Sequence, residues 1–554
     1  MLYECDLETT KNADGSMRAW LIDACEIADG FKHTTFDTLD SFMHWAEDEA
    51  FYRDIVLYWH NFKFDGSYLV NWLHDNGYKW ASKATEPMTY SVLVTERNQW
   101  FMGSMVTQDG YTIEFRDSLK KIPLKVSAIA KAYKLPMSKG EIDYKANRPI
   151  GYQATPEEIS YIHRDTEIVA RAIKIHFDQG MTALTAPADA MTDYKSMVDF
   201  EALFTPRWWR THKSAERFCR DAYCGGISWV NPEIRGKTVR HGRVFDYNSM
   251  YPSVMTMYEY PVGYPIHWFD RPPDDMPLWI AKIKVDNLRR KVGAPACIRD
   301  PYKHEWIEWD FYGEINITNV DYQLLIDNYD FDTIEFIEGY AFRAKRGIFD
   351  CFIDKWRKIK QESTGPMRQL AKLMLNSFYG KFGSNPRRMR KHPEFDDDGV
   401  VHWKCDPAED GGTVFSVAVA AFVTAYARRE LVEGIHNCEG FCYCDTDSVH
   451  CASIDGKAAK FTGKTHPTEF GFWKEESRFV RARFLRQKTY IEEEPSGHLN
   501  IAACGCPESS KKYITFDNFE IGASFKGKLM PKTRKGGVEL IEKRFTIHAP
   551  IFSF

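Results

Sequence analysis

The sequence predicts a multidomain α+β protein whose first 185 residues form an α/β domain. At 554 residues the chain is too long for one ordinary hydrophobic core. Its 44% hydrophobic and 15% aromatic residues are ample for packed domains and argue against disorder. Near the N-terminus, short runs typical of strands alternate with longer runs that have helical spacing.

The elements of the first domain, 1–185, follow from these runs. We expect strands at 2–6, 55–59 and 111–115. The clearest helix is predicted over 156–177, where apolar residues recur every three or four positions. A stretch that contains Thr, Ala and Pro, 182–192, is the expected junction with the second domain, 186–554.

The second domain reads as mixed α+β. Two irregular stretches interrupt it, 258–277 with many Pro and Tyr residues and 391–412 with many Asp and Gly residues. Each is either an insertion at the domain surface or an ordinary long loop, and composition does not separate the two.

Charge and cysteine usage restrict the class of protein. The chain has 73 basic and 78 acidic residues, a net charge of −5, which excludes a simple basic nucleic-acid coat. It lacks a signal peptide, and its longest apolar stretch, 415–427, is too short to span a membrane, so we expect a cytosolic protein with no membrane partner. Thirteen irregularly spaced cysteines fit free thiols in a reducing compartment, and the two Cys-x-Cys pairs lack a second pair at zinc spacing.

A first group of acids comes from three separate segments. Asp6 and Glu8 project from the same side of a predicted strand, and Asp65 follows another strand at the start of a helix. Asp165 lies one helical turn after Tyr161, on the same face. An isolated acid of this kind more often has a structural role than a catalytic one. Together, four carboxylates can hold two cations about 4 Å apart, which suits phosphodiester cleavage, and oxygen-only ligands favour Mg²⁺ or Mn²⁺.

A second group of acids lies in the second domain. Asp246 ends a short strand, and Asp445 and Asp447 lie at the tip of a predicted hairpin that lifts them clear of the sheet. The two segments are far apart in sequence, so only the fold can bring them together. Adjacent to each other, Asp246 and Asp447 could clamp two Mg²⁺ ions between a primer 3′-hydroxyl and a nucleoside triphosphate.

Between these acids, a predicted helix carries a polar stripe. Lys372, Asn376 and Tyr379 fall on one face at helical spacing, and Arg368 and Lys360 extend its cationic edge. On such a face, the cation would suit a triphosphate, the amide would suit the edge of a base, and the aromatic ring would suit a base stacked on it. For an isolated segment, a solvated amphipathic helix is the more common explanation.

In this order, the motifs resemble those of family-B DNA polymerases. The D-x-E, N-x-x-x-D and Y-x-x-x-D segments resemble the three exonuclease motifs, whereas the YPS, KLMLNSFYG and CDTDS segments resemble polymerase motifs A, B and C. The whole chain is similar to the bacteriophage protein-primed subgroup, including a Tyr-x-Gly-Gly element at 223–226. Basic runs at 387–391, 478–488 and 526–535 flank the motifs, as expected of a DNA channel.

The resemblance implies an RNase-H-like α/β exonuclease domain followed by a right-hand polymerase domain with two insertions. It places the palm at 186–257 and 416–520, the fingers at about 347–382 and the thumb at about 521–554. The insertions then span about 258–346 and about 383–415.

The resemblance also implies roles for individual residues. The exonuclease catalytic group is Asp6, Glu8, Asp65, Tyr161, Asp165 and Lys139, and the polymerase catalytic group is Asp246, Asp445 and Asp447. Each site would use two Mg²⁺ or Mn²⁺ ions, held by Asp6, Glu8, Asp65 and Asp165 or by Asp246 and Asp447. Tyr161 would orient the attacking water.

Substrate contacts are implied in the same way. The nucleotide-binding group is Tyr251, which would exclude a 2′-hydroxyl, with Lys360, Arg368, Lys372, Asn376 and Tyr379. The DNA-binding group is Thr9, His60, Asn61, Phe64, Ser118, Leu119, Tyr223, Gly225, Gly226, Ser249, Thr424, Arg428, Thr446, Lys488 and Tyr490. Lys488 and Tyr490 would hold the primer end.

These expectations define a template-directed DNA-dependent DNA polymerase with a proofreading 3′→5′ exonuclease. By resemblance it would act as a monomer in the host bacterial cytoplasm on template-primer DNA and dNTPs. A priming (terminal) protein would be its partner, and synthesis of a linear phage genome would be processive and strand-displacing. The alternatives are a stand-alone nuclease with a DNA-gripping C-terminal part, a non-enzymatic factor with decayed sites, and a family-B polymerase that uses nucleic-acid primers. The acids of the second site argue against the first two, and the sequence leaves the third open.

Overall fold

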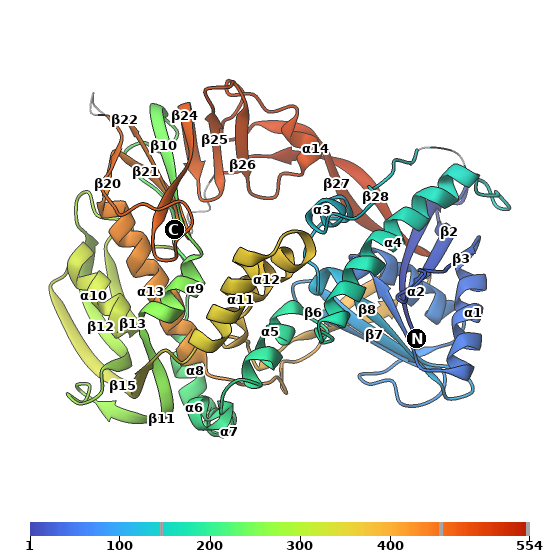
Figure 1. The fold of residues 1–554 in the computed structure, drawn as a ribbon, viewed down its shortest axis with the longest axis horizontal. Coiled ribbons are helices and arrows are strands. Elements are labelled where there is room, and N and C mark those ends of the chain that lie inside the picture. The colour runs from blue at the N-terminus through green and yellow to red at the C-terminus, as the bar shows by residue number, and fades with distance from the viewer. Residues whose placement is uncertain (144–145, 147, 454–457, 550–554) are drawn as a thin grey trace.

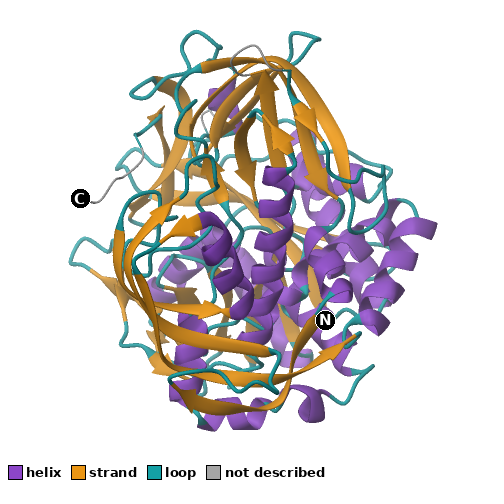
Figure 2. Cartoon of the chain, turned by 90° about the vertical axis from the view of Figure 1, so that its left-hand side faces the viewer, coloured by secondary structure: helices purple, strands orange, loops and turns teal. Residues whose placement is uncertain are grey.

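The computed structural model describes residues 1–143, 146, 148–453 and 458–549 (Figure 1). The N-terminal domain lies at one end of the molecule, and the sheets of the second domain lie at the other. Seen from the side, strands gather at the top and lower left of the molecule, and helices gather at its centre and right (Figure 2). No helix among these residues is long and apolar enough to cross a membrane.

The N-terminal domain is built on a ten-stranded mixed sheet with the strand order β18-β17-β6-β7-β8-β4-β1-β2-β3 and β5 (Lys79–Trp80) paired to β6. Helix α4 (Pro156–Asp178) packs against β1 and β2, and it confirms the predicted helix. Thr155 begins this helix with a capping box that includes Glu158. The predicted strand 55–59 is confirmed as β4. The strand and helix bounds are β1 (Leu2–Lys11), β2 (Met17–Glu26), β3 (His33–Phe36), α1 (Leu39–Tyr52), β4 (Ile55–Trp59), α2 (Phe62–Asp75), β6 (Thr89–Thr95), β7 (Trp100–Val106) and β8 (Thr112–Asp117).

Two strands of this sheet come from the second domain. Strands β17 (Arg390–Phe395) and β18 (Val401–Cys405) form a hairpin, and β17 continues the sheet by pairing antiparallel with β6. The expectation of an irregular stretch at 391–412 is therefore wrong over much of its length. Cross-strand pairing, which local composition does not reveal, orders this segment.

The central sheet of the second domain has seven strands in the order β26-β25-β24-β10-β22-β21-β9. The predicted hairpin is confirmed, because β21 ends at Asp445 and β22 begins at Ser448. The strand bounds are β9 (Ser228–Val230), β10 (Thr238–Tyr247), β21 (Phe441–Asp445), β22 (Ser448–Ser453), β24 (Trp473–Arg486), β25 (Thr489–Glu493) and β26 (Leu499–Ala503).

A separate five-stranded sheet covers the range of the first expected insertion. It has the order β11-β15-β12-β13, with β14 (Tyr329–Asp330) paired to β12, and carries helix α10 (Asn319–Asn328). Strand β11 (Glu259–Phe269) occupies much of the stretch that we expected to be irregular, which corrects that prediction. The other strands are β12 (Leu278–Arg290), β13 (Phe311–Thr318) and β15 (Thr333–Arg346).

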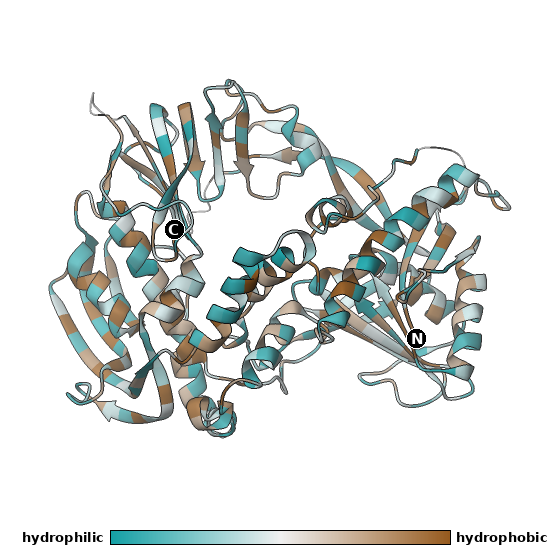
Figure 3. Cartoon of the chain, viewed as in Figure 1, coloured by the Kyte–Doolittle hydropathy of each residue, from teal (hydrophilic) through white to brown (hydrophobic). Residues whose placement is uncertain are grey.

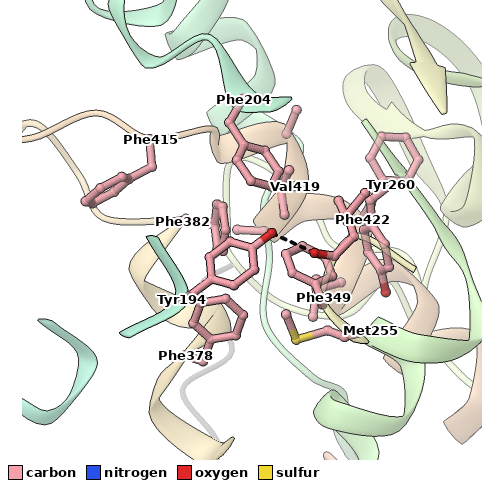
Figure 4. Close-up of a cluster of buried hydrophobic side chains, with 14 of the residues drawn as sticks. Tyr194, Phe204, Met255, Tyr260, Phe349, Phe378, Phe382, Phe415, Val419 and Phe422 are labelled. Carbon is pink, nitrogen blue, oxygen red and sulfur yellow. Dashed lines mark hydrogen bonds between the residues drawn. The ribbon is translucent and has the colours of Figure 1, made fainter. Parts of the chain in front are cut away.

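An aromatic core joins the helices at the centre of the molecule (Figure 4). Tyr194 packs against Phe349, Phe378 and Phe382, and its hydroxyl donates to the backbone carbonyl of Ile348 over 2.8 Å. The core includes residues of helices α5 (Ala186–Lys195), α11 (Asp350–Glu362), α12 (Gly365–Ser377) and α13 (Val417–His436). The expected junction 182–192 therefore overlaps the start of a packed helix.

Helices α11 and α12 carry many hydrophilic residues, unlike the apolar strands of the sheets (Figure 3). The expectation that Lys360 and Lys372 extend one helix is wrong, because Lys360 lies on α11 and Lys372 on α12. Tyr379 lies beyond the end of α12, in a short 3-10 turn. The two cations nevertheless stay close, because the helices pack against each other.

The C-terminal hairpin of β27 (Ser524–Arg534) and β28 (Gly537–Thr546) reaches across to the N-terminal domain (Figure 1). The amide of Met17 donates to the carbonyl of Lys535 over 2.9 Å, and the hydroxyl of Tyr68 donates to that of Val538 over 2.7 Å. Both ends of the molecule are thus joined at the tip of this hairpin. Residues 550–554 of the predicted thumb lie outside the described residues.

Candidate active sites

The first group of acids meets on one side of the N-terminal sheet. Asp6 and Glu8 lie on β1, Asp65 in the first turn of α2, and Asp165 on α4. Burial and the neighbouring charge of Asp165 raise the pKa of Asp6 to about 7. Burial and the charge of Asp6 raise the pKa of Glu8 to about 8, and the same two causes raise that of Asp65. These pKa values rise partly because the buried carboxylates repel one another, and a cation bound among them would relieve that repulsion.

The environment of Asp165 also suits a bound cation. Its Oδ1 atom is buried and has no hydrogen-bond partner among the described residues, whereas Oδ2 contacts the ammonium group of Lys139. Burial raises the pKa of Asp165 although Lys139 opposes the change. Lys139 also lies 5.5 Å from the centre of the Tyr161 ring. The structure thus brings all six predicted catalytic residues of this site together, with oxygen ligands suited to Mg²⁺ or Mn²⁺.

His60 is neutral and fixed in orientation. Its Nε2 atom donates to the carbonyl of Leu124 over 2.7 Å, which leaves Nδ1 to accept from the hydroxyl of Ser118 over 2.9 Å. Burial lowers the pKa of His60 to about 4. Ser118 itself is fully buried. The prediction that Ser118 contacts DNA is therefore revised, because its side chain acts through His60.

Sequence reasoning missed a third acid on the same strand. Glu4 precedes Asp6 by two residues and so points to the same side of β1. Its side chain is buried, with Oε1 3.3 Å from the Ser118 hydroxyl oxygen, and has a pKa raised well above its usual value by burial and by Asp6. The alternation Glu-x-Asp-x-Glu at 4–8 was the available signal.

The second group of acids meets where two strands of the central sheet pair. Asp246 on β10 is the cross-strand partner of Ser448, and the amide of Tyr247 donates to the carbonyl of Asp447 over 2.7 Å. Burial, Asp246 and Asp445 raise the pKa of Asp447 to about 6. The strand register and the raised pKa of Asp447 therefore place Asp246 and Asp447 in one electrostatic environment, where a bound cation would relieve their repulsion.

Two lysines neutralise these acids. The ammonium of Lys488 lies 2.6 and 2.7 Å from the two carboxylate oxygens of Asp445. The ammonium of Lys474 on β24 lies 3.5 Å from Oδ2 of Asp246, its direct cross-strand partner. Sequence reasoning missed Lys474, which lies just before a basic run and in no recognised motif.

A cavity of about 980 Å³ lies beside the second group of acids. Lys360 donates to the hydroxyl of Ser249 over 3.1 Å, and its pKa is lowered by burial and by Arg368, Lys372 and Lys474. The cavity is therefore lined by both carboxylates and cations, a combination suited to divalent ions and a nucleoside triphosphate. The predicted residues that line the cavity are Asp246, Ser249, Lys360, Arg368, Lys372, Asn376 and Asp447.

Tyr251 and Tyr379 form a stacked pair. Their ring centres are 4.1 Å apart and their planes differ by 24°. Ser249, just before Tyr251, has a left-handed backbone with φ of 53°, which turns the chain from β10 into helix α9 (Met250–Met257). The turn allows Tyr251 to follow Asp246 closely while pointing away from the strand.

The Tyr-x-Gly-Gly element packs against the acidic hairpin. A Cβ atom on Gly226 would lie 2.9 Å from the side chain of Thr446, whereas one on Gly225 would meet nothing within 4 Å. The amide of Thr446 donates to the carbonyl of Ile227 over 2.7 Å. Tyr223, beside this element, packs against Gly383.

Arg428 and Thr424 require a correction. Both side chains are buried: Arg428 binds Asp321 and the carbonyls of Cys224 and Gly225, and Thr424 donates to the carbonyl of Ala420. The prediction that they contact DNA is revised, because they hold the Tyr-x-Gly-Gly element and helix α13 in place. The other predicted DNA contacts are at least partly exposed: Thr9, His60, Asn61, Phe64, Leu119, Tyr223, Gly225, Gly226, Ser249, Thr446, Lys488 and Tyr490.

Comparison with known proteins gives consistent matches over the whole chain. The profile of the family "DNA polymerase type B, organellar and viral" matches residues 48–461. The chain is 36% identical to the DNA polymerases of Bacillus phages Nf and phi29, covering 99% of each protein. Its structure is similar to that of phi29 DNA polymerase complexed with primer-template DNA, with a TM-score of 0.90, 33% identity and 99% of both chains covered. The ternary complex of phi29 DNA polymerase with primer-template DNA and incoming nucleotides matches with a TM-score of 0.89, 34% identity and the same coverage.

Proposed function

Because the chain belongs to the organellar and viral type B DNA polymerases, we propose roles for its residues in template-directed synthesis and in 3′→5′ proofreading. The chain is a DNA polymerase that carries an exonuclease. The observation that supports the residue roles best is the cavity of about 980 Å³, which is lined by the carboxylates Asp246, Asp447 and Glu476 and by six lysine and arginine side chains.

In synthesis, Asp246 and Asp447 would hold the divalent ions. When bound, such ions favour loss of the primer 3′-hydroxyl proton and neutralise charge that develops on pyrophosphate. Lys360, Arg368 and Lys372 bind the triphosphate of the incoming nucleotide, since their positive charges converge on the cavity. The stacked Tyr251–Tyr379 pair would exclude a 2′-hydroxyl from the sugar of the incoming nucleotide.

Lys474 and Lys488 act as internal counter-ions. Lys474 lies on β24 and Lys488 in the turn between β24 and β25, and each contacts an acid, so each holds its carboxylate in position when no substrate is present. Lys488 is exposed and can leave Asp445 to contact the phosphate backbone at the primer end. In this proposal, the role of Asp445 is to anchor Lys488, the lysine that binds the primer.

In proofreading, Asp6, Glu8, Asp65 and Asp165 would hold the ions, and Tyr161 orients the water that attacks the terminal phosphodiester. Lys139 neutralises Asp165 and lies close to the Tyr161 ring, so it supports the position of that water. His60 and Phe64 hold the unpaired 3′ end. As neutral imidazole with both nitrogens hydrogen-bonded, His60 provides a rigid wall rather than a proton.

A priming protein would bind the separate five-stranded sheet at 259–346. This sheet shares one face with the core of the central sheet, while Tyr312 on β13 and Tyr302 and Trp309 in the β12–β13 connection are large exposed aromatic side chains. Aromatic residues of this kind anchor protein–protein interfaces. The polymerase would attach the first nucleotide to that partner and then extend it processively. The β17–β18 and β27–β28 hairpins, which both contact the N-terminal domain, support processivity by enclosing the DNA.

The test is extension of a singly primed circular template with Mg²⁺ and dNTPs. Products much longer than the circle are expected from the wild type, and none from Asp246→Asn/Asp447→Asn. Asp6→Asn/Asp165→Asn should extend the primer but fail to remove a mismatched 3′ end. Asp397→Asn and Asp109→Asn, which change exposed acids outside both sites, serve as matched controls.

Two outcomes would contradict the proposal. If the wild type degrades the primer but does not extend it, only the nuclease activity would remain. Products that stop at one circle length would remove the processive, strand-displacing part. Incubation with the cognate priming protein and labelled dNTP tests priming separately, because a covalent protein–nucleotide adduct forms only if that protein is a substrate.

A further inference from the structure

A cluster of metal-ligating side chains lies in the N-terminal domain outside both groups of catalytic acids. Asp23 on β2, His33 on β3 and His163 on α4 place one ligand atom each within 4.8 Å of one another. The described residues contain no other group of this kind. The three residues come from three different elements, so the tertiary fold assembles the cluster.

The register of the sheet explains how these side chains meet. Asp23 pairs across the strands with Thr35, and Cys25 pairs with His33, so Asp23 and His33 share one face of the sheet. Helix α4 packs on that face. Along α4, His163, Thr166 and Glu167 follow at helical spacing and point back toward β2 and β3.

The distances in the cluster suit a small transition-metal ion. His33 Nδ1 lies 2.8 Å from Asp23 Oδ2, and His163 Nε2 lies 3.3 Å from Asp23 Oδ1. In a tetrahedral site with ligands at about 2.0–2.1 Å from the ion, ligand atoms are about 3.3 Å apart. The two imidazole rings are stacked with centres 4.1 Å apart and planes 16° apart, so a ring must rotate for both nitrogens to point in-plane at one ion.

Neighbouring side chains hold the three candidate ligands in position. Glu167 Oε2 lies 3.6 Å from His33 Nε2, the nitrogen that would face away from the ion. A carboxylate behind a histidine ligand fixes its orientation and raises its basicity. The hydroxyl of Thr166 donates to Asp23 Oδ2 over 2.6 Å, and the Thr35 hydroxyl lies 2.8 Å from His163 Nε2. Asp23 is fully buried, but the partly exposed His163 gives an ion a path from solvent.

We propose that Asp23, His33 and His163 form a binding site for one Zn²⁺-class ion, with the fourth position open to water. Nitrogen ligands select such an ion over Mg²⁺, which prefers oxygen. In the metal-free protein, Nδ1 of His33 faces Asp23 with a hydrogen bond. On binding, a neutral His33 moves this proton to Nε2, beside Glu167, and a protonated His33 releases the extra proton to solvent.

The ion would tie α4 to β2 and β3. Because α4 also carries Tyr161 and Asp165, it would fix the helix on which the exonuclease residues lie. Asp23 is also the direct cross-strand partner of Asp6, so a cation at Asp23 offsets repulsion between these two acids. The site is therefore structural and adjacent to the exonuclease, but distinct from its carboxylate ligands.

The test is equilibrium dialysis of the full chain against buffered Zn²⁺ in a large excess of Mg²⁺, followed by metal analysis. Mg²⁺ occupies the oxygen-only sites, so one Zn²⁺ per chain should remain. It should be lost in His33→Gln and in His163→Gln but kept in His44→Gln, an exposed histidine of the same domain. Asp65→Asn should also keep it, because Asp65 belongs only to the exonuclease group.

Two further readouts separate ligation from a folding defect. Glu167→Gln keeps all three ligands and should weaken Zn²⁺ binding by about 10-fold or more. Bound Co²⁺ should give the strong visible absorption of a four-coordinate ion with nitrogen ligands, and His163→Gln should remove it. Zn²⁺ should raise the melting temperature of the wild type and of His44→Gln but not that of His163→Gln.

The proposal is overturned if Mg²⁺ displaces all Zn²⁺, or if the two histidine variants bind as much Zn²⁺ as the wild type. It is also overturned if Asp65→Asn removes the ion, because the exonuclease carboxylates would then be its ligands. Retention of Co²⁺ with only weak, six-coordinate absorption would likewise contradict it.

Discussion

Arg428 and Asp321 form a buried ion pair with two parallel contacts, Nε to Oδ1 over 2.8 Å and Nη2 to Oδ2 over 2.7 Å. The remaining nitrogen, Nη1, donates to the carbonyls of Cys224 and Gly225 over 2.7 and 2.8 Å. One side chain of α13 therefore holds α10 of the five-stranded sheet and the Tyr-x-Gly-Gly element in fixed positions relative to the acidic hairpin.

Arg428→Met should destabilise the fold by about 3–5 kcal/mol, because it leaves the Asp321 carboxylate buried without a cation. Urea denaturation measures the change. Arg428→Met/Asp321→Leu should recover most of the loss, since no buried charge remains unpaired. A cost below about 1 kcal/mol for the single variant would show that water reaches Asp321.

Gly226→Ala should slow nucleotide addition while leaving exonuclease activity unchanged. The new methyl group would lie 2.9 Å from Thr446 and would displace the hairpin that carries Asp445 and Asp447. Overpacking of this kind costs about 1–3 kcal/mol, so we expect a fall of about 10-fold in single-turnover rate. Gly225→Ala is the matched control, because a Cβ there meets nothing within 4 Å. Equal defects in both variants would contradict the steric explanation.

Without divalent metal, the stability of the protein should decrease as the pH rises from about 4 to about 8. Asp6 and Glu8 have ordinary pKa values of 3.8 and 4.5, which rise to about 7 and about 8 in the folded state. In that window the folded protein holds more protons than the unfolded chain, so raising the pH favours unfolding.

Melting temperatures across this pH range in EDTA measure the effect. The slope should be smaller for Asp6→Asn/Glu8→Gln and unchanged for Asp109→Asn. Mg²⁺ binds the ionised carboxylates and should therefore stabilise the wild type more at pH 8 than at pH 5. If the metal-free wild type instead becomes more stable as the pH rises, Asp6 and Glu8 do not share a buried site with raised pKa values.

Tyr251→Val should allow ribonucleotides into the polymerase site. Removing the ring opens space beside Tyr379 where a 2′-hydroxyl would lie. The ratio of kcat/KM for rNTP to that for dNTP should rise by about 10-fold or more, equivalent to about 1.4 kcal/mol. Tyr302→Val, at an exposed tyrosine of the five-stranded sheet, should leave the ratio unchanged. If both variants discriminate as the wild type does, Tyr251 does not select the sugar.

Local patterns in the sequence predicted the elements that carry the chemistry. Strand β4, helix α4 and the hairpin that ends at Asp445 follow from periodicity and turn position, and the structure confirms them. The alternation in β1 likewise predicted that Asp6 and Glu8 share a face. These features depend on residues close together in the chain, which is why sequence alone sufficed.

Features that depend on long-range pairing were not predictable. Lys474 neutralises Asp246 only because β24 pairs with β10, and no local pattern announces that register. Burial of Ser118, Thr424 and Arg428 follows from packing of several segments, so their motif positions alone suggested exposed DNA contacts. Strand β11 was missed because its prolines are more typical of loops than of strands.

The pairing of β17 with β6 means that the N-terminal domain is not a self-contained unit of folding. A fragment that ends near residue 185 would leave β6 as an open edge, where Arg390 and Lys391 now pair with Thr95 and Val94. Unpaired amides and carbonyls on such an edge recruit other strands, so the fragment should self-associate. Exchange of exonuclease domains between relatives would likewise require the β17–β18 hairpin to move with them, although it lies far away in the sequence.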